Sequence, residues 1–142
     1  MAKMKLAGGC QCGAARYSID APAIETAHCW CGMCRKIHGA IMVTFSIFPK
    51  DKFTLEKGGD DLGCYRSSPP ARRYFCKNCG CPLYILSDNH PDIVELATGT
   101  LDGGAHPGHP DGKLCHMWVG SKVSWHPITD DLPQYEKSTP ED

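Results

Sequence analysis

The sequence has 142 residues, a formal net charge of −1, and 42% hydrophobic and 22% charged residues. This length suits a single domain over residues 1–142, and the composition argues against a disordered or fibrous chain. The charge lacks the basic excess that neutralises phosphates, so nucleic acid is not expected as a partner. Ten cysteines are the one unusual feature of the composition.

The N-terminal stretch carries lysines but no apolar run of signal-peptide length. The longest mostly apolar stretch, residues 40–48, is far shorter than the roughly 20 residues that span a bilayer. We therefore expect a cytoplasmic protein with no membrane partner. In that reducing compartment, cysteines tend to bind metal rather than form disulfides.

Most of the chain predicts short strands. Val43, Phe45 and Ile47 alternate with polar residues, which indicates a half-buried strand. Turn signals separate further strand candidates at residues 15–19, 73–76, 83–86, 93–98, 115–119 and 123–125. A helix of one or two turns is credible only over residues 32–39, because 15 glycines and 11 prolines interrupt the rest. The expected fold is all-β, with short antiparallel strands and a frayed polar tail over residues 134–142.

Seven cysteines fall into three compact motifs, GGCQCG, HCWCGMC and FCKNCG. Zinc prefers four tetrahedral ligands and often takes them as close pairs from separate segments. A CxC pair on an extended strand shares one face, and the turn of a CxxCG motif aims both sulfurs inward. The simplest partition makes one closed structural site and one three-ligand site with an open position, the pattern of catalytic zinc. The closed site would use Cys10, Cys12, Cys76 and Cys79, and the open site Cys29, Cys31 and Cys34.

Two alternatives remain at this point. A zinc ribbon would pair Cys31 and Cys34 with Cys76 and Cys79, although it leaves the other three motif cysteines unused. Iron–sulfur ligation also uses thiolates, but the spacings match no ferredoxin pattern. Cys81 can reach either site, and as a fourth ligand it would close the second one.

Other side chains near the HCWCGMC motif are candidates for binding or proton transfer. Arg35 and Lys36 follow Cys34 and could bind an anionic ligand, while His28 and His38 flank the motif and could carry protons. A glycine- and proline-rich loop with His106 and His109 could cover the site. The three tryptophans are expected in the core or in a pocket wall.

These motifs resemble the glutathione-dependent formaldehyde-activating family, which includes S-(hydroxymethyl)glutathione synthases and centromere protein V relatives. The similar stretches are GGCQCGAARY, HCWCGMCRKIHGA, FCKNCGCPL, GTLD and HMWVGSKVSWHPITDDLPQ, in this order from residue 8 to about 134. The resemblance implies an Mss4-like zinc-bearing β fold and the same division of the seven cysteines into structural and catalytic ligands.

The resemblance also implies a reaction. It points to a carbon–sulfur lyase with two zinc ions per chain that forms S-(hydroxymethyl)glutathione from glutathione and formaldehyde. The implied partners are a small thiol and an aldehyde, and a homodimer is possible. The alternative is a non-catalytic, zinc-stabilised protein-interaction module of the same fold, because a fold does not decide a function.

Overall fold

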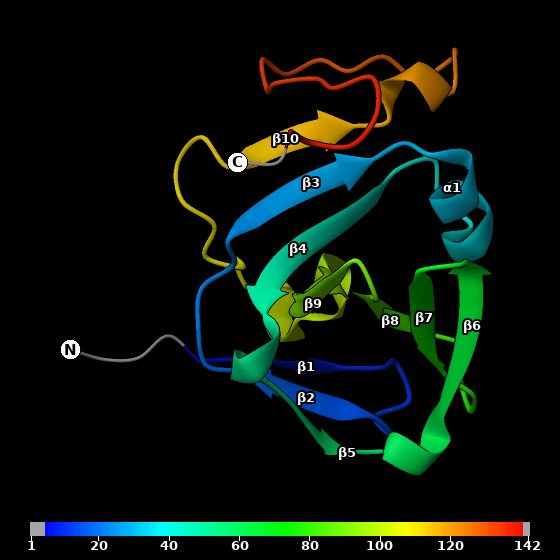
Figure 1. Ribbon diagram of the computed structural model, residues 1–142, viewed down its shortest axis with the longest axis vertical. Helices are drawn as coiled ribbons and strands as arrows, with labels where there is room; N and C mark the ends of the chain where they lie inside the picture. Colours follow the sequence, from blue (N-terminus) through cyan, green and yellow to red (C-terminus); the bar gives the residue numbers. More distant parts are fainter. Residues whose placement is uncertain (1–4, 141–142) are drawn as a thin grey trace.

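The computed structural model describes residues 5–140 as two β-sheets (Figure 1). The smaller sheet has the order β1-β2-β5, formed by β1 (Leu6–Gly9), β2 (Arg16–Ile19) and β5 (Phe53–Lys57). The larger sheet has the order β10-β3-β4-β9-β8-β7-β6. Its strands are β3 (Glu25–Cys29), β4 (Val43–Pro49), β6 (Leu62–Ser68), β7 (Ala71–Cys76), β8 (Pro82–Ser87), β9 (His90–Ala97) and β10 (Leu114–Met117).

The all-β class expected from the sequence is confirmed. All strand pairs among the described residues are antiparallel except β10 with β3, which is parallel and corrects the expectation of antiparallel strands alone. Short 3-10 turns connect several strands at Lys50–Lys52, Gly59–Asp61, Thr98–Thr100, Asp102–Gly104 and Val119–Ser121.

The helix predicted over residues 32–39 is present as α1 (Gly32–His38). The Cys31 side chain caps its start by accepting a hydrogen bond from the backbone N–H of Cys34. Gly39 ends it with a φ of 61°, in the left-handed region that glycine adopts without strain. The HCWCGMC motif is therefore a strand end followed at once by a capped helical turn.

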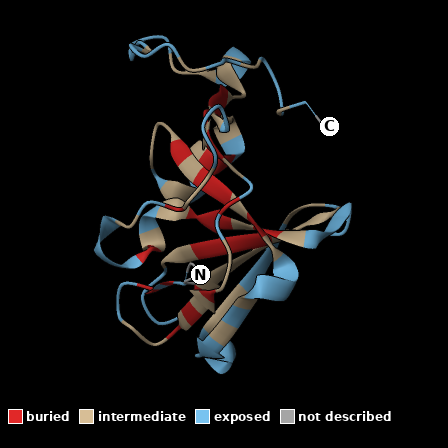
Figure 2. Ribbon diagram, turned by 90° about the vertical axis from the view of Figure 1, so that its left-hand side faces the viewer, coloured by how far each residue is buried: buried red, intermediate tan, exposed pale blue. Residues whose placement is uncertain are grey.

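The main core lies between the two sheets. Tyr17 and Ile19 of β2 pack in one cluster with Phe48, Val94 and Leu96 of the larger sheet, and these side chains are at most 2% exposed. Figure 2 shows the buried strands running through the centre of the molecule. A second, smaller cluster on the larger sheet includes Cys29, Cys34, Val43, Phe45, Ile85 and Ala97.

Strand β4 is buried on both of its faces, so the expected half-buried pattern is wrong there. Ser46, expected on a polar face, is 0% exposed. Its hydroxyl is 2.8 Å from the hydroxyls of both Thr26 and Thr98, which satisfies its hydrogen bonding in the core. Ser46 therefore lies in the core, Thr44 is half-buried, and Ile47 lines a cavity.

The predicted strand at residues 123–125 does not form, and Trp125 is 70% exposed rather than packed. The other predicted strands are present with shifted ends. The CxC pair of GGCQCG also lies in a turn after β1, where the N–H of Gly13 donates to the carbonyl of Cys10, and not on an extended strand.

The segment expected to be a frayed tail runs beside β10. The backbone N–H of Tyr135 donates to the carbonyl of His116, and that of Trp118 donates to the carbonyl of Lys137. Farther along, the Thr139 hydroxyl donates to the Glu25 carboxylate. Residues 141–142 of this expected tail lie outside the described residues.

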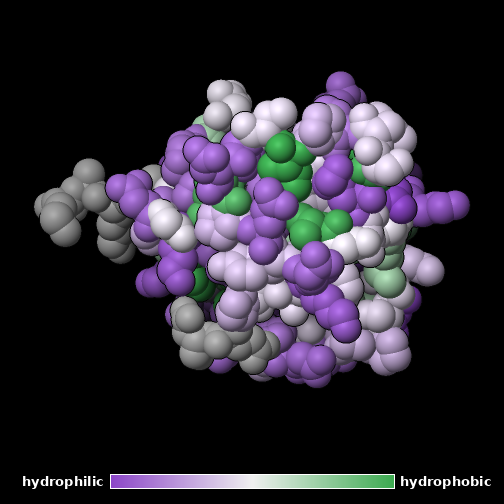
Figure 3. Space-filling view, turned by 90° about the horizontal axis from the view of Figure 1, so that it is seen from above, coloured by the Kyte–Doolittle hydropathy of each residue, from purple (hydrophilic) through white to green (hydrophobic). Residues whose placement is uncertain are grey.

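The face at the top of Figure 1 is mostly hydrophilic, with its hydrophobic side chains in small groups (Figure 3). The view shows no broad apolar patch of the size typical of a protein interface among its coloured residues. Within residues 5–140, no helix is long and apolar enough to cross a lipid bilayer.

Candidate active site

Cys10, Cys12, Cys76 and Cys79 form one group whose sulfurs all lie within 4.8 Å of one another. Two come from the turn after β1, whereas Cys76 ends β7 and Cys79 lies in the turn between β7 and β8. The Cys12 sulfur is 3.6 Å from the Cys10 sulfur and 3.8 Å from the Cys76 sulfur. The group therefore joins segments 64 residues apart in sequence.

Cys29, Cys31 and Cys34 form a second group, whose sulfurs also all lie within 4.8 Å of one another. Cys29 ends β3, Cys31 caps α1 and Cys34 lies in its first turn. The sulfurs of Cys29 and Cys34 are 3.7 Å apart. Side-chain hydrogen bonds with Cys29 and Cys34 lower the pKa of the Cys31 thiol. The hydrogen bond between Cys29 and Cys31 raises the pKa of the Cys29 thiol. A thiolate at Cys31 is thus stabilised by its neighbours.

Both groups fit a tetrahedral metal ion. Four sulfurs about 2.3 Å from a zinc ion lie about 3.8 Å from one another in a regular tetrahedron. The distances of 3.6, 3.7 and 3.8 Å agree with that geometry. The first group offers four sulfur ligands and the second offers three.

Cys81 belongs to neither group in the described part of the chain. Its thiol donates to the carbonyl of Pro82, and burial raises its pKa. The other thiols that act on this pKa are Cys79, Cys10 and Cys12, so Cys81 lies near the four-cysteine group. It does not supply a fourth sulfur to the three-cysteine group.

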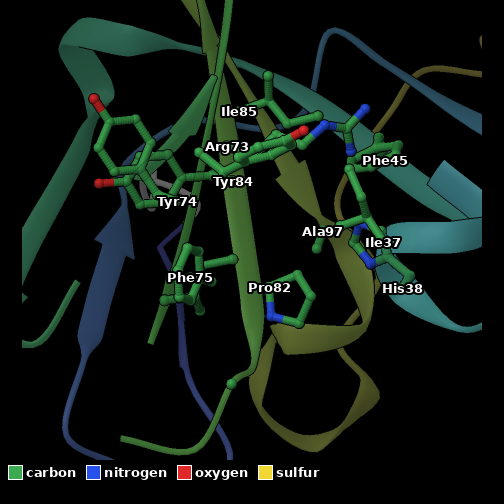
Figure 4. A pocket seen from close by; sticks show the side chains of 13 residues that line it. Ile37, His38, Phe45, Arg73, Tyr74, Phe75, Pro82, Tyr84, Ile85 and Ala97 are labelled. Atoms are coloured by element: carbon green, nitrogen blue, oxygen red, sulfur yellow. The ribbon is translucent and has the colours of Figure 1, made fainter. Parts of the chain in front are cut away.

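Arg73 on β7 is a functional candidate that the sequence analysis missed. Its Nη2 atom donates to the Cys34 sulfur at 3.4 Å, and its Nε donates to the Ser67 hydroxyl at 2.9 Å. Its buried Nη1 has no hydrogen-bond partner. Figure 4 shows the side chain extending toward Phe45 and the α1 residue Ile37. The only sequence signal was an arginine three residues before Cys76, and nothing local links it to a cysteine 39 positions earlier.

A cavity of about 400 Å³ opens beside the three-cysteine group. All three cysteines line it, together with Arg73 and Glu95. Its volume lies within the range of small-molecule binding pockets. The cavity gives a ligand direct access to the three sulfurs.

Trp118 also lines this cavity, in agreement with its expected place in a pocket wall. Its φ of 58° is the one left-handed value of a non-glycine residue between positions 5 and 140. Such strain persists where surrounding structure fixes the backbone, and it is common at functional sites. Here the hydrogen bond from the Trp118 N–H to Lys137 is part of that support.

Arg35 and Lys36 are not among the side chains that line the cavity. Arg35 donates to the backbone carbonyls of Trp30 and Ser121, which ties α1 to the segment after β10. Lys36 is exposed. Their predicted role in binding a ligand stays a prediction, and the cation that the structure places at the sulfurs is Arg73.

The histidines lie in several places around the motif. His28 is bonded through Nδ1 to the Thr44 hydroxyl, and burial lowers its pKa. His38 packs edge-on against Phe45 and lines a neighbouring cavity of about 300 Å³. His106 and His109 contact each other in their loop, with ring centroids 4.5 Å apart. None of the four is among the residues that line the three-cysteine cavity.

His116 supports the motif from behind. The indole N–H of Trp30, between Cys29 and Cys31, donates to its Nδ1 at 2.9 Å. Its Nε2 is therefore the protonated nitrogen and donates to the Asp130 carboxylate at 3.0 Å. His116 is 3% exposed, so this chain of hydrogen bonds fixes the Trp30 ring in the core.

A family model described as glutathione-dependent formaldehyde-activating enzyme matches residues 5–121, a stretch that contains both cysteine groups and Arg73. The chain belongs to this family. The family resemblance expected from the motifs is confirmed.

Curated relatives carry the same description. A Halomonas elongata protein named "Putative glutathione-dependent formaldehyde-activating enzyme" is 24% identical over 86% of this chain and 80% of its own length. Proteins of the same name from Podospora anserina and Phaeosphaeria nodorum are 34% and 28% identical over 56% and 69% of this chain. The matches span 39% and 55% of these two fungal proteins.

A crystal structure of a Rhodobacter sphaeroides protein has a similar fold. Its TM-score is 0.56 at 21% identity, and the superposition covers 70% of this chain and 89% of that one.

Proposed function

We propose that this protein is a zinc-dependent carbon–sulfur lyase that catalyses the addition of glutathione to formaldehyde, with Cys29, Cys31 and Cys34 as the catalytic zinc ligands. The observation that carries the proposal is the cavity of about 400 Å³ lined by a group with three sulfur ligands and, within residues 5–140, no fourth. Family membership names glutathione and formaldehyde as the reactants.

The two cysteine groups take different roles in this proposal. Cys10, Cys12, Cys76 and Cys79 complete a tetrahedral set and hold a structural zinc ion that connects two distant turns. The other group leaves one coordination position for the thiol of the substrate. When bound there, zinc supplies a positive charge that favours the thiolate over the thiol at neutral pH.

Arg73 offsets excess negative charge at the catalytic group. Three thiolates and one Zn²⁺ carry a formal charge of −1, which disfavours the approach of an anionic thiol. The positive charge of the guanidinium beside the Cys34 sulfur reduces this negative charge. It therefore favours binding of a thiolate in the cavity.

The overall reaction is an addition without net oxidation. The substrate sulfur forms a bond to the formaldehyde carbon, the carbonyl oxygen becomes the hydroxyl of the product, and the thiol proton is conserved as the hydroxyl proton. Phe45, Met117 and Trp118 form apolar walls of the cavity, and surroundings of low polarity strengthen the electrostatic interactions made at the sulfurs.

The test measures S-(hydroxymethyl)glutathione formation by NMR exchange spectroscopy, with zinc-loaded protein, chelator-treated protein and the C31S variant. C64S is the matched control, because Cys64 is outside both groups. Acceleration by the wild type and C64S but not by C31S is the expected result. Absence of acceleration above the uncatalysed rate would reject the proposed reaction.

The presence of two zinc ions per chain is tested by metal analysis of the purified protein. About two are expected in the wild type and about one in C31S. A single zinc ion in the wild type would contradict the two-site assignment. The predicted homodimer requires a separate measurement of mass in solution.

A further inference from the structure

Glu95 is a carboxylate inside the cavity that the proposed reaction leaves unused. It lies on β9, lines the same 400 Å³ cavity as the three cysteines, and also lines an adjoining cavity of about 490 Å³. Burial raises its pKa. Among residues 5–140, no hydrogen bond or ion pair engages its side chain. A half-buried carboxylate without a partner in the described part of the protein is available to bind a cationic group of a ligand.

The register of the sheet places Glu95 relative to Arg73. Arg73 pairs with Ile85 across β7 and β8, and Ile85 pairs with Glu95 across β8 and β9. Their Cα atoms therefore lie on one transverse row, two strand spacings or about 10 Å apart, with both side chains on the same face of the sheet. Arg73 reaches the Cys34 sulfur, and Glu95 lines the same cavity from the second strand along this row.

The charges around Glu95 agree with this placement. Arg73 and His90 lower its pKa and Glu25 raises it, whereas none of the three thiols acts on it. The guanidinium of Arg73 is already bonded to Cys34 and Ser67. Glu95 is the one acidic side chain among the described residues that line this cavity, and it would attract a positively charged group of a ligand.

We propose that Glu95 binds the ammonium group of the thiol substrate and thereby selects thiols with a free amine, an inference that rests on the proposed function. In an extended γ-glutamyl thiol, eight bonds separate the sulfur from the amino nitrogen, a span of about 10 Å. With its sulfur at the cysteine group and Arg73, such a molecule places its ammonium near the Glu95 carboxylate. The sulfur and the ammonium then each meet a group of complementary charge.

The test compares binding of glutathione and N-acetylglutathione to zinc-loaded protein by calorimetry at pH 7, where an α-amino group is protonated. The proteins are the wild type, E95Q and E25Q. Glu25 is the matched control, because it is a carboxylate on the same row that lines the adjoining cavity and not the one with the cysteines.

The wild type and E25Q should bind glutathione about 10- to 100-fold more tightly than N-acetylglutathione, the range typical of a charged hydrogen bond. E95Q should bind glutathione only as weakly as it binds N-acetylglutathione, so that the difference between the two thiols disappears. In turnover, E95Q should raise KM and leave kcat nearly unchanged, because the ammonium does not react. A purely structural role of Glu95 would weaken both thiols equally and keep the discrimination.

The outcomes separate the two proposals. Discrimination that survives in E95Q, or wild-type protein that binds both thiols equally, would overturn the role of Glu95 and leave the proposed reaction standing. Zinc-loaded wild type that binds neither thiol would overturn both. The wild-type comparison of the two thiols remains decisive even if E95Q fails to fold.

Discussion

The two cysteine groups should contribute unequally to stability, and three buried cysteines allow a matched comparison. Cys10 belongs to the four-cysteine group, Cys29 to the three-cysteine group, and Cys115 to neither. Their exposures are 6%, 3% and 7%. Replacement of each by serine therefore changes packing similarly, and differences among the variants report the loss of metal ligands.

The size of the difference follows from the chain segments that each group joins. A structural zinc site contributes on the order of 10 kcal/mol, comparable to the total stability of a domain. The four-cysteine group links Cys12 to Cys76, which are 64 residues apart in sequence, whereas Cys29 and Cys34 of the other group are only 5 residues apart. The longer loop adds about 2 kcal/mol to the entropy that the metal removes from the unfolded chain. C10S should therefore lose several kcal/mol more than C29S.

Thermal unfolding followed by circular dichroism, with zinc content measured on the same samples, tests this expectation. C10S should unfold at least about 15 °C below C115S, and C29S within a few degrees of it, given the usual relation between stability and Tm. C29S should nonetheless lose one zinc ion. Equal decreases of Tm in C10S and C29S would refute the division into structural and catalytic groups.

Three further changes test other parts of the structure. Gly8→Ala places a Cβ 2.3 Å from the Tyr17 hydroxyl and should lower the free energy of unfolding in urea by about 1 to 3 kcal/mol. Gly99→Ala, which has open space around it, is the control and should have little effect. Equal effects of the two substitutions would contradict the close packing at Gly8. E95Q should unfold at a higher Tm than the wild type at pH 7.5, because burial raises the pKa of Glu95 in the folded protein and its ionised carboxylate then destabilises the fold. This gain in Tm should shrink as the pH falls toward about 4.3, the pKa of a glutamate in the unfolded chain, and a gain independent of pH would argue against this cause. His116→Leu removes the acceptor of the buried Trp30 N–H and should cost about 1 to 3 kcal/mol of unfolding free energy in denaturant titrations; an unchanged midpoint would show that the hydrogen bond is dispensable.

Much of the site was predictable because its residues are close in sequence. The spacing of Cys29, Cys31 and Cys34 restricts their sulfurs to one turn, and Gly39 ends the helix by its backbone preference. The CxC and CxxC spacings predict each close pair of the four-cysteine group in the same way, whereas the meeting of the two pairs, 64 residues apart in sequence, depends on the tertiary structure. The predictable features depend on local geometry, which neighbouring residues determine.

Strands were harder to predict where tertiary packing decided their burial. Four strands, β1, β3, β5 and β6, lie outside those expected from the sequence, and the short glycine- or threonine-containing sequences of β1 and β3 show little alternation. Ser46 was assigned to a polar face because its type is polar, although its hydroxyl finds partners inside the core. Burial on both faces removes the period-two pattern by which a strand is recognised.

The sequence by itself determined the all-β class, the short helix over residues 32–39 and the cysteine motifs from which the two groups form. Only the tertiary structure decided that Cys81 lies outside the three-cysteine group and that Arg73 reaches the Cys34 sulfur. The register of three strands likewise put Glu95 in the same cavity, two strands from that arginine. The physical reason is that pairing between strands distant in sequence depends on the packing of the whole sheet, whereas the spacing of a metal-binding motif depends on a few adjacent residues.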